Sequence, residues 1–486
     1  MADELAKRVR VAETAAALER LERDVAVWVG HRRERDLLRQ YATPLATLER
    51  TLLGAVSSLR VEAGALSLGV PLGDLHAKAA NLDQRAALVR KVWAWFQAKF
   101  DQRDRHDDQR LVAVLAAADE VVWSCWKEAF DSAALSGGPV AERGPAPLPY
   151  VDSEGGAEAF VRDEPPTGLG ASEADQALGR FLVRLPVPVV RLPVGCLDSP
   201  WWLALLAHEV GHHLQYDLLL DAALVAEVGG LVAGAVSGGP AEAARWRGWS
   251  RELFADACAL VVLGPAAISV TLQVELGGEA ALLDPARSRY PAPAVRLALL
   301  AALADQLGLD PLPALGGFGD PAALAASRAA SAGADPLAAR RERVRADLTQ
   351  VPKVAAALLE APLGGLGPLP RLFRFKAADH GPAGRYARWA DAIERGTAQP
   401  EPILRAAREV AAGAVHAWRK LAAIADDGDR ARALASLAEE LPALLAASRP
   451  AGTRAGDSER APQDLGAELA ALVREAVPEG GAVVGG

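Results

Sequence analysis

The chain has 486 residues, 51% of them hydrophobic, and a formal net charge of −9 at pH 7. This length and composition indicate a globular protein of roughly three domains with ample material for a core. The mild charge, without an acidic or basic tail, argues against a nucleic-acid-binding face. The abundance of Ala, Leu, Arg and Gly is typical of coding in a GC-rich bacterium.

Cysteine usage and the apolar runs bear on where the protein works. Cys125, Cys196 and Cys258 are odd in number and far apart, so they predict packed thiols in a reducing compartment rather than disulfides. The charged residues 1–7 lack the apolar centre of a signal peptide. The longest apolar runs are broken by charge, glycine or proline, so none predicts a membrane span. We therefore expect a cytoplasmic protein that does not contact a membrane.

Residues 1–135 have a helical pattern and are predicted to form a bundle or coiled-coil-like domain. Two apolar stripes at heptad-like spacing indicate a pair of antiparallel helices. The stripes consist of Leu18, Leu21, Val25 and Trp28, then Leu45, Leu48, Leu52, Val56 and Leu59. A second helix pair follows, separated by a charged run at 101–110 that we interpret as a solvated turn. The spacing permits an intramolecular bundle or a homo-oligomer.

Residues 136–180 are rich in Gly, Pro and acidic side chains, and they are predicted to be a linker or a flap over the site. In 181–194, β-branched residues alternate with prolines, which restricts a strand there to an edge or bulged strand. Because an edge strand can pair with an extended peptide, Val187, Val189 and Val190 are candidates for substrate binding.

The next predicted helix carries the chemistry. Asp-Ser-Pro at 198–200 is a helix start signal, and His208-Glu209-Val-Gly-His212 follows in an apolar context. Residues four apart share one helix face, so His208 and His212 can present two imidazoles to one metal ion. Glu209 can then reach a water at that metal and act as a general base. Gly211 allows another backbone to approach closely.

A catalytic zinc ion needs a third protein ligand and an open position for water. The best candidate is Glu252, in a predicted helix at 245–263, with Asp217 and Glu227 as weaker alternatives. Asp256 lies one turn beyond Glu252 and can accept a hydrogen bond from the outer nitrogen of a ligating histidine. The plainer interpretation of Glu252 and Asp256 is an exposed charged helix face.

The combination of His-Glu-Val-Gly-His with a downstream Glu-Leu-Phe-Ala-Asp resembles the gluzincin group of zinc metallopeptidases, over roughly residues 186–307. The resemblance implies a zincin-like core within a mainly α fold and one Zn²⁺ per chain. Carried over to this sequence, it makes His208, His212 and Glu252 the metal ligands. It also makes Glu209 the general base and Asp256 an orienting residue.

The sequence departs from similar peptidases after the Glu-containing helix, where they have a His-Pro segment followed by an arginine. This chain has Tyr290-Pro291 and then Arg296. The Tyr290 hydroxyl is a candidate to stabilise the oxyanion, or it belongs to a packed aromatic. Arg296 is a candidate substrate clamp or a member of a structural ion pair. His213 lies off the ligand face, so we expect it to bind a neighbouring group or to face solvent rather than bind the metal.

We place the peptidase core at 181–310, a helical C-terminal domain at 311–448 and a flexible tail with one short amphipathic element at 449–486. The leading hypothesis is a soluble zinc-dependent endopeptidase of narrow specificity that acts on a polypeptide substrate. Its helical flanks are candidates to receive a protein partner or regulator. The alternative is a catalytically silent, metal-stabilised regulatory protein built on a peptidase fold.

Overall fold

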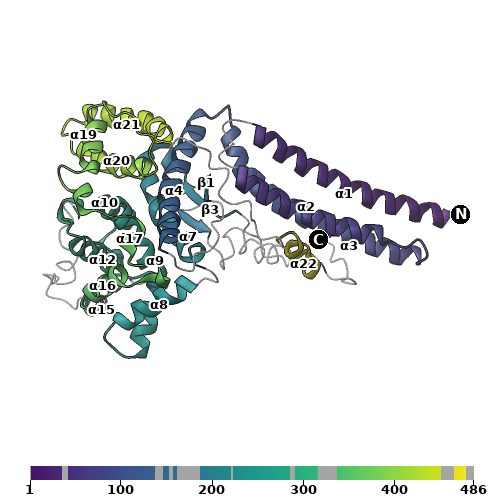
Figure 1. Ribbon diagram of the computed structural model, residues 1–486, viewed down its shortest axis with the longest axis horizontal. Helices are drawn as coiled ribbons and strands as arrows, with labels where there is room; N and C mark the ends of the chain where they lie inside the picture. The colour runs from purple at the N-terminus through teal and green to yellow at the C-terminus, as the bar shows by residue number, and fades with distance from the viewer. Residues whose placement is uncertain are drawn as a thin grey trace.

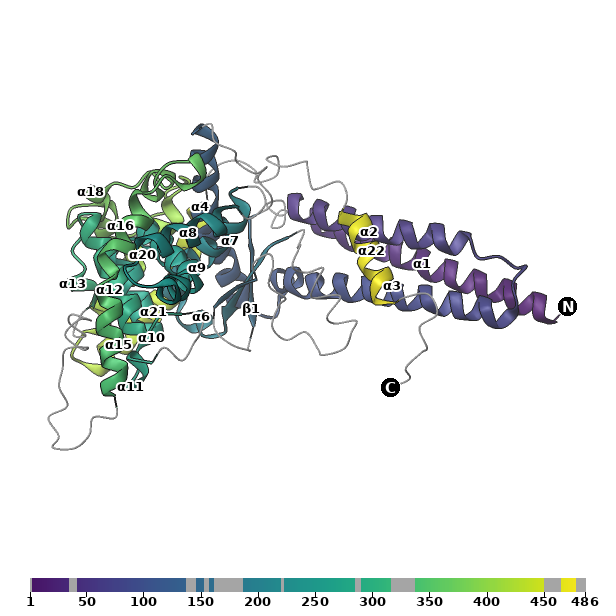
Figure 2. The same cartoon turned by 90° about the horizontal axis from the view of Figure 1, so that it is seen from below.

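The computed structural model describes residues 2–34, 42–136, 146–152, 157–160, 187–219, 223–284, 290–315, 337–449 and 465–477. The fold is mainly helical with one small sheet, which confirms the mainly α part of the predicted fold class. A helical arm projects from a larger body (Figure 1 and Figure 2). Within the described ranges, no helix is both long enough and apolar enough to cross a bilayer.

The arm consists of α1 (Ala2–Glu34), α2 (Ala42–Gly64) and α3 (Leu72–Asp101). The side chains of both predicted apolar stripes are buried in one cluster between these helices, so the heptad-like spacing reflects intramolecular packing. The arm gains a fourth helix from the far end of the chain, α22 (Leu465–Ala476), which packs against α2 and α3. The predicted amphipathic element of the tail is therefore present, and it is docked.

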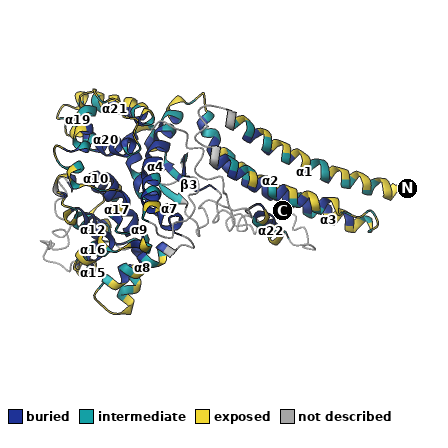
Figure 3. Ribbon diagram, in the orientation of Figure 1, coloured by how far each residue is buried: buried dark blue, intermediate teal, exposed yellow. Residues whose placement is uncertain are grey.

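The body has a single apolar core that extends from Val114 to Leu445. Its helices and short turns are α4 (Gln109–Leu135), α6 (Gly195–Asp198), η3 (Pro200–Leu205), α7 (Leu206–Asp217), α8 (Ala223–Ala235), α9 (Pro240–Leu263), α10 (Pro265–Glu275), α11 (Glu279–Leu282), α12 (Pro293–Gln306), α13 (Leu312–Leu315), α15 (Ala338–Leu348), α16 (Val351–Glu360), η6 (Leu363–Gly365), α17 (Leu369–Leu372), α18 (Ala377–His380), α19 (Arg385–Glu394), α20 (Ala406–Ala422) and α21 (Asp427–Ala447). Figure 3 shows buried residues concentrated in α4, α7, α9 and α20, whereas the N-terminal part of α1 is exposed.

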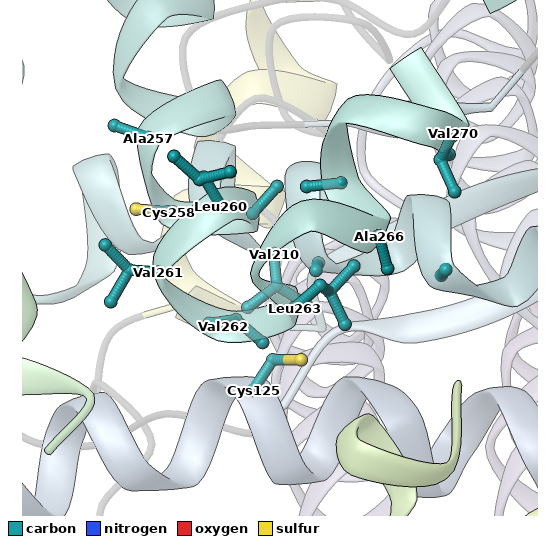
Figure 4. Packing of buried hydrophobic residues seen from close by; sticks show 14 of the residues in the cluster. Cys125, Val210, Ala257, Cys258, Leu260, Val261, Val262, Leu263, Ala266 and Val270 are labelled. Carbon is teal, nitrogen blue, oxygen red and sulfur yellow. The ribbon is translucent and has the colours of Figure 1, made fainter. Parts of the chain in front are cut away.

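This packing differs from the predicted domain division. Helix α4, which we assigned to the N-terminal domain, belongs to the core that surrounds α7 and α9. The helices from Leu312 to Ala447 share that core and do not form a separate one. In Figure 4, Cys125 of α4 lies beside Val210 of α7 and Val262 and Leu263 of α9. All three cysteines are free and buried, as predicted.

The sheet contains β1 (Leu148–Asp152), β2 (Glu158–Phe160) and β3 (Val189–Pro193) in the order β1-β3-β2. Strand β1 is parallel to β3 and β2 is antiparallel to it. The segment 136–180, predicted to be a linker or a flap, contains β1 and β2, so it is not a plain linker at these two places. Besides the two strands, the described residues of that segment are 136, 146–147 and 157. The rest of the segment lies outside the described residues.

The prediction of an edge strand at 181–194 was also wrong, because β3 is the central strand of the described sheet. Val187, Val189 and Val190 are buried in the core and do not face a substrate. The physical reason is the exact position of the prolines. Those that precede β3 lie outside the strand and Pro193 ends it, so the residues between them can pair on both sides.

The charged run at 101–110 joins the arm to the sheet. Helix α3 continues into η2 (Gln102–Asp104), where the Gln102 amide donates to the Val151 carbonyl at 2.8 Å and accepts from the Val151 N–H at 2.9 Å. Arg103 is buried and donates to both carboxylate oxygens of Asp119 and to the Pro149 carbonyl. The expectation of a solvated turn was therefore wrong for Gln102 and Arg103.

Helix α7 begins at Leu206, six residues after the start that the signal at Pro200 predicts. Pro200 begins η3, a 3₁₀ helix that continues directly into α7, and the Ser199 side chain forms no cap. Proline at the first helical position is as expected, because its missing N–H would have no partner there. The late start places His208 and Glu209 close to the N-terminus of α7.

Candidate metal centre

Three side chains from α7 and α9 converge on one point. His208 Nε2 lies 3.1 Å from His212 Nε2, and each of these atoms lies 3.3 Å from Glu252 Oε2. Zinc binds such donors at about 2.0–2.1 Å in a tetrahedral arrangement, which places pairs of donors about 3.3–3.4 Å apart. Among the described residues, this is the group of His, Cys, Asp or Glu that fits a metal ion, and it includes neither Asp217 nor Glu227.

A cation between the atoms of this cluster would satisfy all three of them. Glu252 Oε2 is buried and has no hydrogen-bond partner among the described residues. When the outer nitrogen of an imidazole carries the proton, its Nε2 is a lone pair, and two such lone pairs with a carboxylate oxygen repel one another. The same three atoms are the donor set of a catalytic zinc site, so the residues fit this metal without rearrangement.

A close approach of two helices makes the convergence possible. A Cβ added at Gly211 on α7 would lie 2.9 Å from Ala255 Cα and 3.1 Å from Cys258 Cβ on α9. One turn further, Gln215 Nε2 donates to the Arg251 carbonyl at 2.8 Å. The predicted role of Gly211 is therefore confirmed, because only a glycine lets the backbone of α9 approach at this position.

Asp256 and Arg296 fix the orientation of His208. Asp256 Oδ1 lies 2.9 Å from His208 Nδ1, and Arg296 Nε and Nη2 contact the two Asp256 oxygens at 2.6 and 2.7 Å. A hydrogen bond from Nδ1–H to Asp256 assigns the tautomer whose Nε2 lone pair faces the cluster. Arg296, on α12, also donates to Glu275 of α10 at 2.7 Å.

Burial and charge shift the proton affinities of these groups. Burial would lower the pKa of His208, but the neighbouring carboxylates of Asp256 and Glu252 outweigh it and raise that pKa to about 10. Burial would raise the pKa of Glu252, but His212 and His208 hold it far below its usual range. Asp256 likewise has a lowered pKa despite its burial, because Arg296 lies against it. A bound metal would displace the proton from His208, since only the neutral ring is a ligand.

Glu209 lies beside the cluster and contacts the sheet. It is buried, and burial raises its pKa above the usual range for a glutamic acid. The backbone of Ala159 in β2 forms a hydrogen bond with its carboxylate. The strand next to the general-base candidate is thus β2, which the sequence analysis did not identify. Its three residues are too few to show an alternating pattern.

His213 connects α7 to the sheet. Its Nε2 lies 3.2 Å from the Val189 carbonyl of β3, and the side chain is buried. The geometry agrees with the expectation that His213 binds a neighbouring group rather than the metal. The sheet thus contacts α7 at Glu209 and at His213.

Tyr290 and Arg296 lie on the α12 side of the cluster. The Arg296 guanidinium is 5.7 Å from the centre of the Tyr290 ring. Burial, together with the nearby carboxylates of Glu252 and Glu209, raises the pKa of Tyr290, so its hydroxyl keeps its proton. Arg296 is buried with donors engaged by Asp256 and Glu275, which favours the structural ion pair over a substrate clamp.

Comparisons with protein-family models, with curated proteins and with solved structures found no match. The function proposed for the site therefore rests on the donor set and its surroundings.

Proposed function

We propose that this chain is a zinc-dependent endopeptidase. The observation that supports the proposal most strongly is the convergence of two imidazole nitrogens and one carboxylate oxygen at separations of 3.1 to 3.3 Å. The side chains of His208 and Glu252 retain 13% and 12% exposure. Three protein ligands would leave a fourth zinc position for water, which is typical of a catalytic rather than a structural zinc site.

A bound zinc ion would lower the pKa of a water molecule at the site and polarise a substrate carbonyl. Glu209 would take a proton from that water and return it to the leaving amine. Its burial suits both steps, because a carboxylate with a raised pKa holds the transferred proton more readily. Tyr290, whose hydroxyl stays protonated, is the candidate donor to the negative charge that develops on the carbonyl oxygen.

Asp256 and Arg296 position His208. Asp256 holds His208 in the tautomer and ring orientation that ligation requires, and Arg296 holds Asp256 by two hydrogen bonds. Arg296 thus acts on the site through Asp256 and His208, and its Nη2 also lies 3.4 Å from His208 Nδ1. This replaces the clamp role considered from the sequence.

The substrate that suits the site is an extended peptide beside β2. Within the described sheet, β2 pairs with β3 on one side only, so its other edge offers backbone groups for pairing. Ala159 of this strand contacts Glu209, so a peptide aligned there would pass close to the general base. The proposed substrate therefore remains a polypeptide, but the strand that it would pair with is β2 rather than β3.

Metal analysis and proteolysis together test the proposal. The purified chain should contain one zinc ion, and it should cleave a denatured protein pool in a manner that a chelator stops and added zinc restores. Glu209→Gln should keep the zinc ion and lose cleavage. Glu227→Gln is the matched control, because Glu227 lies on α8 outside the ligand group, and it should retain both. A Glu209→Gln variant that still cleaves, or a wild-type chain that binds no zinc, would refute the proposal.

A further inference from the structure

The C-terminal helix α22 has one apolar face, and that face is buried against the arm. Its buried positions follow the i, i+3, i+4, i+7 spacing of a single helix face. They are Gly466, Leu469, Ala470 and Val473, whereas Ala467, Ala471, Arg474 and Glu475 are exposed. The helix therefore packs on the surface of the arm through one face and is not surrounded by core residues.

Helices α22 and α2 cross so closely that only small residues fit at the point of contact. A Cβ at Gly466 would lie 2.9 Å from Gly54 Cα and 3.2 Å from the Thr51 carbonyl. A Cβ at Gly54 would in turn lie 3.0 Å from Gly466 Cα. Both backbones thus need a glycine at the same point, which fixes the position of α22 along the arm.

Charged and polar groups of the arm receive the end of α22. Arg85 of α3 is buried, and its Nε and Nη2 donate to the Val477 carbonyl at 3.2 and 3.0 Å. Asn81 Nδ2 donates to the same carbonyl at 3.1 Å. Glu62 of α2 accepts hydrogen bonds from both Arg85 and Arg474. Because the last carbonyls of a helix have no partners within it, the arm supplies a cap that α22 lacks.

Helix α22 is a short segment whose stability depends on this surface. At 12 residues it is too short to persist as an isolated helix in water. Its main contacts are with α2 and α3, and residues 450–464 connect it to the body. Docking and folding of α22 are therefore one event, as for a peptide that folds on binding.

We propose that the α2–α3 face of the arm is a binding site for a short amphipathic helix, and that residues 465–477 are its tethered, releasable occupant. A helix that fits this site has a glycine at the crossing, apolar residues three, four and seven positions later, and an arginine in its last turn. Its final carbonyl must be free to accept from Arg85 and Asn81. The inference does not depend on the metal centre.

Peptide binding to three full-length chains tests this proposal. The probe is a fluorescent peptide with the sequence of residues 465–477, and the chains are wild type, Gly466→Leu and the matched control Ala467→Leu on the exposed face. Gly466→Leu should release α22 and bind the peptide. With a tether concentration on the order of 1 mM and a peptide Kd of about 50 µM, wild type and Ala467→Leu should bind it about 20-fold more weakly. A peptide that itself carries Gly466→Leu should not bind.

Amide hydrogen exchange of residues 466–477 provides the second measurement. These amides should be protected in wild type and Ala467→Leu and should exchange rapidly in Gly466→Leu. Unchanged protection in Gly466→Leu would overturn the proposal, because the glycine crossing would then be dispensable. Equal peptide binding by all three chains would overturn it as well, since the peptide would then occupy another site. Rapid exchange of α22 in Gly466→Leu without binding of the peptide would overturn the proposal too.

Discussion

Replacing Gly211 by alanine should weaken zinc binding without any change to a ligand. The added Cβ would lie 2.9 Å from Ala255 Cα, whereas ordinary contact begins at 3.4 Å, so α7 and α9 must separate by the difference of about 0.5 Å. The histidines lie on α7 and Glu252 on α9. A shift of this size exceeds the tolerance of about 0.2 Å in zinc–ligand distances. We expect zinc affinity to fall by about 10- to 100-fold.

The matched control is Gly248→Ala, a position on α9 where an added Cβ meets nothing within 4 Å. Alanine stabilises a helix interior by about 1 kcal/mol relative to glycine, and both variants gain this contribution. In Gly211→Ala the overpacking should cost about 1–3 kcal/mol. A 100-fold weaker affinity should also remove about 2.7 kcal/mol of zinc-dependent stabilisation.

Competition with a chromophoric chelator measures the affinity, and urea unfolding with and without zinc measures the stability. Zinc affinity within about twofold of wild type, together with a stability equal to that of Gly248→Ala, would show that the helix contact does not set the ligand geometry.

Three further predictions concern the surroundings of the site and the arm. Asp256→Asn should reduce zinc affinity about 10- to 100-fold, because an amide does not enforce the required His208 tautomer; unchanged affinity in chelator competition would contradict this. Burial lowers the pKa of Lys99 from 10.5 to about 7, so folding should become more favourable as the pH rises from about 7 to 10.5, where the unfolded chain binds the extra proton. Lys99→Met should remove this rise, and urea midpoints across that pH range that are parallel in wild type and variant would contradict it. His213→Phe keeps the ring but leaves the Val189 carbonyl without the histidine, and should cost about 1–3 kcal/mol; an unchanged urea midpoint would show that the contact contributes nothing.

The residues of the cluster could be predicted from the sequence because a helix fixes which residues share a face. His208 and His212 are four residues apart, as are Glu252 and Asp256, so each pair can be recognised as sharing a helix face without knowledge of the fold. The structure brings both pairs together at hydrogen-bonding distance. Gly211 was also interpretable, since a glycine between two ligands indicates a close backbone.

Other parts of the site depend on contacts between distant segments, and no local pattern reveals them. Glu275 faces Arg296 across two helices, and nothing around it in the sequence distinguishes it from a surface carboxylate. Strand β2 is too short to show a period of two residues. Gln102 and Arg103 lie in a run rich in charge, which is typical of a solvated turn, yet their partners are buried backbone and Asp119.

A glutamine side chain closes one margin of the sheet. By bonding to both the N–H and the C=O of Val151, Gln102 occupies the groups that a further strand would use on β1. A peptide that seeks a strand partner on the described sheet thus finds an open margin at β2, on the side of Glu209. If a force or a partner pulled the arm away from the body, the N–H and C=O of Val151 would lose their Gln102 partner. Strand β1 would then have an unpaired edge that another strand could join. The arm therefore also protects the body against unwanted strand pairing.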